Sequence, residues 1–379
     1  MIMENNNALG LIFSENSEVN LGELLSVRSL AAVPVGGRYR IIDFMLSNMV
    51  NSGIVNVGLA TGYKNQSLID HVGSGRAWDL SRKETGLFIL PPPENQETGG
   101  RIMGGIDYLS GAMRYLRRSR QEYVMISDCN TICNIDLEKV MEFHFQKDAD
   151  ITVVYTMAPN LSEKELEKHI LFDIEEDCRV TDIQIYPKRQ KTDCSYMHMF
   201  FIKKSLLIEM IEDCMAHDEH LISKNILLAN VDKCKIFAYR FDGYKNKIDS
   251  IDSLYRFNLE LLRPDVRAEL FGKGEGMSIY TKVKDSVPTK YGKDADVKNS
   301  VVADGCVIEG NVENCIIFRG VKIGKGSVVK NSIIMQKSQI MDNCTVENAI
   351  FDKEVILCSG KKLMGQSTYP LVIGKRTVV

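Results

Sequence analysis

The sequence predicts two domains, an α/β domain with a mostly parallel sheet and, after it, a parallel β-helix. Three observations support this prediction. The chain has 379 residues, which is too long for one typical core. Up to about residue 265, short apolar runs alternate with longer stretches of helical spacing. From residue 294, apolar residues recur six apart. We therefore assign residues 1–265 to the α/β domain, 266–293 to a linker and 294–379 to the β-helix.

The α/β domain is predicted from four near-continuous apolar runs, which are typical of strands buried on both faces. These runs are 8–13, 56–61, 123–128 and 149–155, and the segments of helical spacing between them are 43–51, 104–118 and 137–146. Alternation of this kind indicates a mostly parallel sheet. Ligands of such domains bind beyond the carboxyl ends of the strands. The loops after Phe13, Thr61 and Ile126 are therefore where we expect chemistry.

The β-helix is predicted from a period of six residues, which is too short for a helical solenoid. The apolar residues at this spacing are Val302 and Ile308, then Ile317, Ile323 and Val329, then Ile334, Ile340 and Val346. Each repeat would form one flat face of the coil. A run of ordinary antiparallel strands is the alternative. The ends of a β-helix need cover from another domain or subunit, so we expect the coil to serve binding and assembly rather than catalysis.

Composition excludes several classes of partner. The formal net charge is −3, which gives no electrostatic reason to bind nucleic acid or an anionic membrane. No apolar stretch approaches the length of a membrane span, and the N-terminus has no signal pattern, so we expect a cytoplasmic protein. The ten cysteines contain no C-x-x-C pair, and we interpret them as free thiols rather than zinc ligands.

Three segments of the sequence resemble those of a known family. They are "AVPVGGRYRIIDFMLSNMVNSGI" (32–54), "GYKNQSLIDHVGSGRAWDL" (62–80) and "GLFILPP" (86–92). They closely resemble ADP-glucose pyrophosphorylase (glucose-1-phosphate adenylyltransferase), and the resemblance extends over nearly the whole chain. It implies a Rossmann-like nucleotidyltransferase domain, a left-handed β-helix and a tetramer. It also implies the reaction of ATP with glucose 1-phosphate to give ADP-glucose and pyrophosphate. Because such transfer depends on positioning and electrostatics, the site needs a phosphate cradle, carboxylates for Mg²⁺ and a grip on the sugar phosphate.

The phosphate cradle is altered in this sequence. The glycine-rich G-G-x-G-T-R-L turn of the family corresponds to residues without glycine, among them Glu15 and Glu18. These carboxylates would repel a nucleotide. The arginine of that turn is Asn20 here, and the lysine of the family's R-A-K-P-A motif is Leu30. Arg28 is the cation that remains.

The metal site retains half of its carboxylates. The aspartate of the family's G-D-H motif corresponds to Asp128, whereas the second metal aspartate, in G-Y-W-x-D-V-G-T, corresponds to Lys247. An ammonium at that position would repel a divalent cation. Asp249 lies two positions further on and could replace the lost carboxylate only if the loop slipped. Asp128 is therefore either a remnant metal ligand or a carboxylate that caps the turn after its strand.

The sugar-phosphate grip is altered as well. The glutamate and lysine of the family's E-K-P motif correspond to Ile185 and Tyr186. The glycine of its M-G motif is His198, whose imidazole would crowd the space that a glycine leaves open. The G-T-A-D-A segment retains Gly104 and Asp107.

Arginines near the start of the domain are candidates for an anion site. In the family this region contributes to effector sites for sugar bisphosphates or phosphate, which makes Arg28, Arg38 and Arg40 candidate effector residues. The simpler interpretation of "GGRYR" (36–40), which we favour, is a turn with solvated arginines.

The phosphate cradle, the metal site and the sugar-phosphate grip are all altered. Each of them typically lowers the activation barrier by several kcal/mol, so we expect a chain without catalytic activity. This pattern resembles the GlgD type of subunit, which the family combines with a catalytic GlgC-type subunit in a mixed tetramer and which raises that subunit's activity. A homo-oligomer is also compatible with the sequence. The first alternative is a weak or altered adenylyltransferase that holds Mg²⁺ with Asp128 and Asp249. The second is a free-standing sensor of sugar phosphates that uses the arginines near Arg38.

Overall fold

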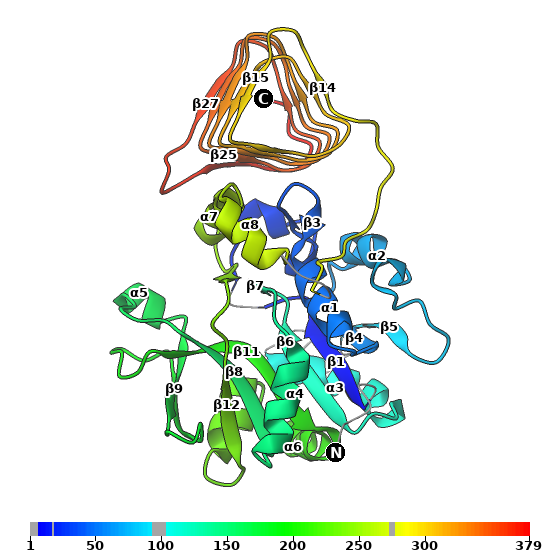
Figure 1. Ribbon diagram of the computed structural model, residues 1–379, viewed down its shortest axis with the longest axis vertical. Helices are drawn as coiled ribbons and strands as arrows, with labels where there is room; N and C mark the ends of the chain where they lie inside the picture. The colour runs from blue at the N-terminus through cyan, green and yellow to red at the C-terminus, as the bar shows by residue number, and fades with distance from the viewer. Residues whose placement is uncertain (1–6, 17–18, 93–103, 273–276) are drawn as a thin grey trace.

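A computed structural model describes residues 7–16, 19–92, 104–272 and 277–379 (Figure 1). The α/β domain lies below a triangular coil in the view of Figure 1, and α7 (Ile251–Glu260) and α8 (Pro264–Leu270) lie between the two. The last helix of the α/β domain ends at Leu270 and the first strand of the coil begins at Lys290, where we expected boundaries at 265 and 294.

The α/β domain is built on a nine-stranded sheet with the order β10-β9-β11-β6-β1-β4-β5, in which β8 pairs with β11 and with β12. Its strands are β1 (Ala8–Phe13), β4 (Asn56–Ala60), β5 (Gly86–Leu90), β6 (Tyr123–Asp128), β8 (Ile151–Met157), β9 (Ile170–Ile174), β10 (Val180–Ile185), β11 (Cys194–Lys203) and β12 (Ile236–Arg240). All of these strands except β10 and β11 run in the same direction, as the pairings require. The mostly parallel sheet is therefore confirmed, and the four apolar runs are β1, β4, β6 and β8.

Helices cover both faces of this sheet. The predicted segments form α1 (Ile41–Asn51), α3 (Gly105–Arg118) and α4 (Leu137–Gln146); the other helices are α2 (Gln66–Val72), α5 (Glu163–Leu166) and α6 (Lys204–Ala216). Helices α1 and α4 contribute to one apolar core, and α3 and α6 to the other. Helix α3 forms because its apolar residues recur three or four apart, and it begins where the Asp107 carboxylate accepts a hydrogen bond from the Gly104 amide.

The C-terminal domain is a left-handed parallel β-helix with three faces of five strands each. The first face is β14 (Lys290–Tyr291), β17 (Val307–Ile308), β20 (Lys322–Ile323), β23 (Gln339–Ile340) and β26 (Ile356–Leu357). The second is β15 (Asp296–Lys298), β18 (Asn311–Glu313), β21 (Val328–Lys330), β24 (Thr345–Glu347) and β27 (Lys362–Met364). The third is β16 (Val301–Val302), β19 (Ile316–Ile317), β22 (Ile333–Ile334), β25 (Ala349–Phe351) and β28 (Leu371–Ile373).

The six-residue period places one buried apolar side chain on each face of the coil. Ile317, Ile323 and Val329 lie on three successive faces and all point into the core. Equivalent positions of stacked turns are 17 residues apart along Asn311, Val328, Thr345 and Lys362. One corner of the coil repeats asparagines in the left-handed conformation, namely Asn299, Asn314, Asn331 and Asn348. The side-chain amide of Asn314 donates to Asn331 Oδ1 at 3.3 Å, so these corners also bond to one another.

The two domains share a buried interface. Ile316, Ile333 and Ile350, on the third face of the coil, belong to the same apolar core as helices of the α/β domain. Across this interface the Arg28 guanidinium lies 2.9 Å from the Asp352 carboxylate, and both side chains are almost fully buried. The third face is therefore a structural part of the α/β core. None of the helices in the described segments is long and apolar enough to cross a membrane.

Candidate functional site

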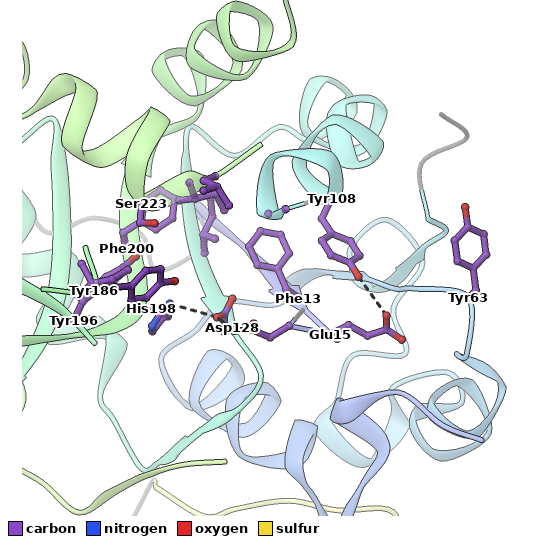
Figure 2. A pocket seen from close by; sticks show the side chains of 17 residues that line it. Phe13, Glu15, Tyr63, Tyr108, Asp128, Tyr186, Tyr196, His198, Phe200 and Ser223 are labelled. Carbon is purple, nitrogen blue, oxygen red and sulfur yellow. Dashed lines mark hydrogen bonds and ion pairs between the residues drawn. The ribbon is translucent and has the colours of Figure 1, made fainter. Parts of the chain in front are cut away.

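A crevice of about 400 Å³ opens at the carboxyl ends of β1 and β6 (Figure 2). Glu15 follows β1, Asp128 ends β6 and His198 lies within β11. The loop after Thr61 contributes Tyr63, and α3 contributes Tyr108. The three loops that the sequence indicated thus meet at one cavity, because the carboxyl ends of parallel strands lie at the same edge of a sheet.

At the predicted metal position, a carboxylate, an imidazole and an ammonium lie in line. Asp128 Oδ2 accepts a hydrogen bond from Asn16 Nδ2 at 3.1 Å and lies 3.5 Å from His198 Nδ1. Lys247 Nζ lies 2.9 Å from His198 Nε2. Burial, reinforced by the charge of Lys247, lowers the pKa of His198 well below its ordinary value. The imidazole is therefore neutral, accepts from Lys247 at Nε2 and presents Nδ1–H to Asp128.

Sequence changes at two distant places produce this arrangement. Lys247 ends β13 (Lys245–Lys247), which pairs with β7 (Thr131–Cys133) just after β6, and this pairing brings the lysine next to His198. His198 has a φ of 55°, the left-handed conformation that a glycine adopts without strain. Its side chain fills the space next to Asp128, where the resemblance implied an open glycine position.

The alternative metal ligand, Asp249, belongs to a different cavity. Its carboxylate lies 3.2 Å from Lys168 Nζ, and it lines a neighbouring cavity of about 210 Å³ together with Lys168 and Lys247. No group of three or more His, Cys, Asp or Glu side chains in the described segments is arranged to hold a metal ion.

At the cradle position, a carboxylate replaces the phosphate-binding backbone. Glu15 Oε2 accepts a hydrogen bond from Tyr108 Oη at 3.4 Å, and a Cβ at Gly62 would lie only 2.1 Å from the same oxygen. Burial raises the pKa of Glu15 above its ordinary value. Glu18, which we also expected to repel a nucleotide, lies outside the described residues. The side chain of Asn20 is exposed and accepts from the Gly22 amide, whereas Leu30 is buried in the core.

The sugar-grip positions carry no cation. Ile185 is the last residue of β10, and Tyr186, which follows it with a φ of 51°, lines the crevice. The retained Asp107 accepts from the Gly104 amide and lies 2.9 Å from His220 Nδ1, so it holds the start of α3.

A second cavity, of about 580 Å³, lies between the two domains and is strongly basic. Two carboxylates, those of Asp70 and Glu354, face eight cationic side chains: Arg38, Arg40, Lys282, Lys284, Arg319, Lys337, Lys353 and Lys375. Burial and the neighbouring cations lower the pKa of Lys353 to about 7. Burial also lowers the pKa of Arg40 to about 10, and its guanidinium donates to Ser67. Such crowding of like charges is relieved when an anion binds.

Two of these cations, Arg38 and Arg40, were predicted from the sequence, and the other six were not. The missed ones come from the linker and from corners of the coil, where Arg319, Gln336 and Lys353 are successively 17 residues apart. This 17-residue spacing is the sequence feature from which the cavity residues of the coil could have been predicted. Arg28 does not line this cavity; it is buried against Asp352 because the interface encloses it. The charge of Arg28 is therefore paired within the fold, and its role as an effector residue stays a prediction.

Comparisons with known proteins agree with this architecture. A nucleotidyl transferase family model matches residues 23–263, and a model of the GlmU-like C-terminal hexapeptide matches residues 284–367. The chain is 37% identical over 376 residues to "Glycogen biosynthesis protein GlgD" of Bacillus subtilis (strain 168), covering 99% of this chain and 98% of the relative. It is 40% identical over 325 residues to the GlgD protein of Geobacillus stearothermophilus, covering 86% and 83%. It is 32% identical over 382 residues to "Glucose-1-phosphate adenylyltransferase" of Clostridium perfringens (strain SM101 / Type A), covering 100% and 97%.

Proposed function

The chain belongs to the nucleotidyl transferase family, in the group of GlgD proteins and glucose-1-phosphate adenylyltransferases, and we propose that it acts in glycogen biosynthesis as a subunit that makes no ADP-glucose itself. In this proposal it associates with a catalytic GlgC-type subunit in a mixed tetramer and enhances that subunit's activity. One observation carries the proposal: the alignment of Asp128, His198 and Lys247 at the metal position.

The residues at that position do not fit a divalent cation. Mg²⁺ prefers near-octahedral oxygen ligands, usually including one or two carboxylates. Among the described residues, Asp128 is the one carboxylate within 4 Å of His198, its Oδ2 already accepts from Asn16, and His198 presents an N–H to it. Glu15, the other carboxylate that lines the crevice, accepts from Tyr108 instead. The ammonium of Lys247 adds repulsion behind the imidazole. We therefore derive no catalytic step through a metal, and transfer to an α-phosphorus would lack its main electrostatic support.

The regulatory part of the proposal rests on the basic cavity between the domains. Its cations, among them Arg38 and Arg40, suit an anionic effector such as a phosphate or sugar phosphate. Lys353 lines that cavity and directly follows Asp352, which pairs with Arg28 across the interface. An anion bound there would contact both domains at once, so its binding energy would favour one relative placement of the domains.

The direct test compares the purified chain, a catalytic glucose-1-phosphate adenylyltransferase subunit from the same organism, and their mixture. We expect background synthesis of ADP-glucose from the chain alone. In the mixture we expect a stable complex by mass measurement and a changed rate or effector response relative to the catalytic subunit at the same concentration. Turnover by the chain alone at the rate of the catalytic subunit would refute the proposal, as would the absence of any complex.

The basic cavity also favours a second candidate, a free-standing sensor of sugar phosphates. Size-exclusion chromatography separates the two functions, because a sensor would elute unchanged when the catalytic subunit is added. The weak adenylyltransferase is tested by calorimetric titration with ATP and Mg²⁺. Only that enzyme requires tight nucleotide binding that depends on the metal.

A further inference from the structure

The outer end of the crevice has the form of a three-sided cage. In Figure 2, the carboxylate of Glu15 lies below and between the rings of Tyr63 and Tyr108. The Phe13 ring lies on the side of Tyr108 away from Tyr63, with 5.7 Å between the centroids of Phe13 and Tyr108. Two tyrosine rings and one carboxylate therefore border the same space, which belongs to the 400 Å³ crevice that Phe13 lines further in.

The charged side chains that line this space are of one sign. Among the described residues that line the crevice there is no lysine or arginine, and the charged side chains are Glu15 and Asp128. His198, which faces Asp128, is neutral because burial lowers its pKa well below the ordinary value. Lys64 does not line the crevice, and its ammonium donates to the Leu25 carbonyl. Its charge lowers the pKa of Glu15, but by less than burial raises it, so Lys64 compensates the carboxylate only in part.

Glu15 is held in place by its neighbours. Tyr108 Oη donates to it at 3.4 Å, and the bare backbone of Gly62 allows its carboxylate to lie where any side chain would collide. Partial burial raises the pKa of the Glu15 carboxyl group, which means that the surroundings do not fully stabilise its charge. A positive charge placed in the cage would supply that stabilisation.

We propose that this crevice binds the ammonium group of a small organic cation, with Glu15 as its counter-ion and the rings of Tyr63 and Tyr108 as its walls. Aromatic faces attract cations, and cages of aromatic rings are the usual recognition of alkylated ammonium groups. A triphosphate is repelled by the same carboxylates. A neutral ring would cover Glu15 without compensating its charge, so it binds less well than a cation of the same shape.

A second feature of this crevice agrees with a binding site. Its far wall begins with a π-helical turn, Ile222–Leu227, a rare conformation that is frequent at functional sites. Ile222 and Ser223 of this turn line the crevice. Gly105 packs so closely beneath the turn that an added Cβ would lie 2.5 Å from Ile222 Cδ1.

The test uses the full chain and two probes of the same shape. Choline carries a quaternary ammonium, and 3,3-dimethylbutan-1-ol is its uncharged isostere. We expect choline to bind about tenfold or more tightly than the alcohol in calorimetric titration or in saturation-transfer NMR. Glu15→Gln, which keeps the shape of the side chain, removes that preference, whereas the exposed control Glu84→Gln keeps it.

Three outcomes would overturn the inference: equal binding of the two probes, no binding of choline at about 10 mM, or an unchanged preference in a folded Glu15→Gln variant. Tyr108→Leu gives a second check, since loss of one wall weakens choline binding by about threefold or more. The experiment involves neither the catalytic subunit nor ADP-glucose. Its failure would leave the proposed regulatory function standing, and failure of that function would leave the cation site standing.

Discussion

The ion pair between Arg28 and Asp352 allows the interface between the domains to be tested quantitatively. Their closest atoms are 2.9 Å apart, and the side chains are 1% and 0% exposed. Arg28→Met removes the guanidinium and keeps most of the apolar length of the side chain. It leaves the Asp352 carboxylate in the interface with the Lys353 amide donating to Oδ1, and Oδ2 has no hydrogen-bond partner among the described residues.

The expected loss of stability follows from burial. Removing one partner of a buried ion pair typically costs about 3–5 kcal/mol, because the other charge remains desolvated. The entropy of unfolding is about 2.1 cal/mol/K per residue, which gives about 0.8 kcal/mol/K for 379 residues unfolding in one transition. We therefore expect Arg28→Met to lower the melting temperature by about 4–6 °C.

Differential scanning calorimetry of three proteins completes the experiment: the unmodified chain, Arg28→Met, and Arg28→Met combined with Asp352→Leu. The double variant should recover most of the loss, because an apolar pair of similar volume no longer buries an unpaired charge. A single variant that melts within about 1 °C of the unmodified chain would refute this reasoning. So would a double variant that is less stable than the single one.

Three further predictions follow from other parts of the molecule. Burial and nearby cations lower the pKa of Lys353 from 10.5 to about 7, so the unfolded chain binds more protons than the folded chain above pH 7, and this group adds stability as the pH rises from about 7 to about 10.5. Sulfate has a constant charge over this range, so its stabilisation of the protein in a thermal shift assay should decrease as Lys353 loses its proton. The Lys353→Met variant should show a smaller decrease. Lys247→Asp combined with His198→Gly should bind Mn²⁺ at about 1 mM by electron paramagnetic resonance, unlike the unmodified chain, and no gain would count against our assignment of the metal position. Asn331 has a φ of 45°, so Asn331→Ala should destabilise the coil by about 1–2 kcal/mol more than Asn331→Gly in thermal unfolding; equal losses would mean that the ladder bonds, rather than strain, dominate.

The parts of the fold that sequence predicts best are those with a strong local pattern. The apolar runs that became β1 and β6, and the spacing that became α3, are each sufficient by themselves. Strand β11 has no such pattern, because polar residues such as Ser195 and His198 interrupt its apolar residues. It also runs antiparallel to β6, and the local sequence does not indicate this direction. Its existence depends on the pairing with β6 and β8.

The sequence predicted the features of the candidate site that arise from replacing one residue of a known motif by another. The sequence indicates that Lys247 replaces a carboxylate and that His198 fills a glycine position. It does not indicate that these two side chains touch, because their contact depends on the pairing of β13 with β7. The basic cavity was missed for the same reason, since Lys353 and Arg319 approach only when the coil stacks.

The stacked turns of the β-helix restrict how the length of this chain can change. Because Val328 pairs with Thr345 and Thr345 with Lys362, deletion of one residue within a strand would turn inward side chains of that strand toward solvent. The corners absorb differences in length, since Asp296 pairs with Asn311 15 residues on and Ala349 with Leu371 22 residues on. Loss of a whole 17-residue turn would leave the flanking turns able to pair as before. Viable natural or engineered length variants of this domain should therefore differ at the corners or by complete circuits, and each circuit gained would lengthen the wall presented to the α/β domain by about 4.8 Å.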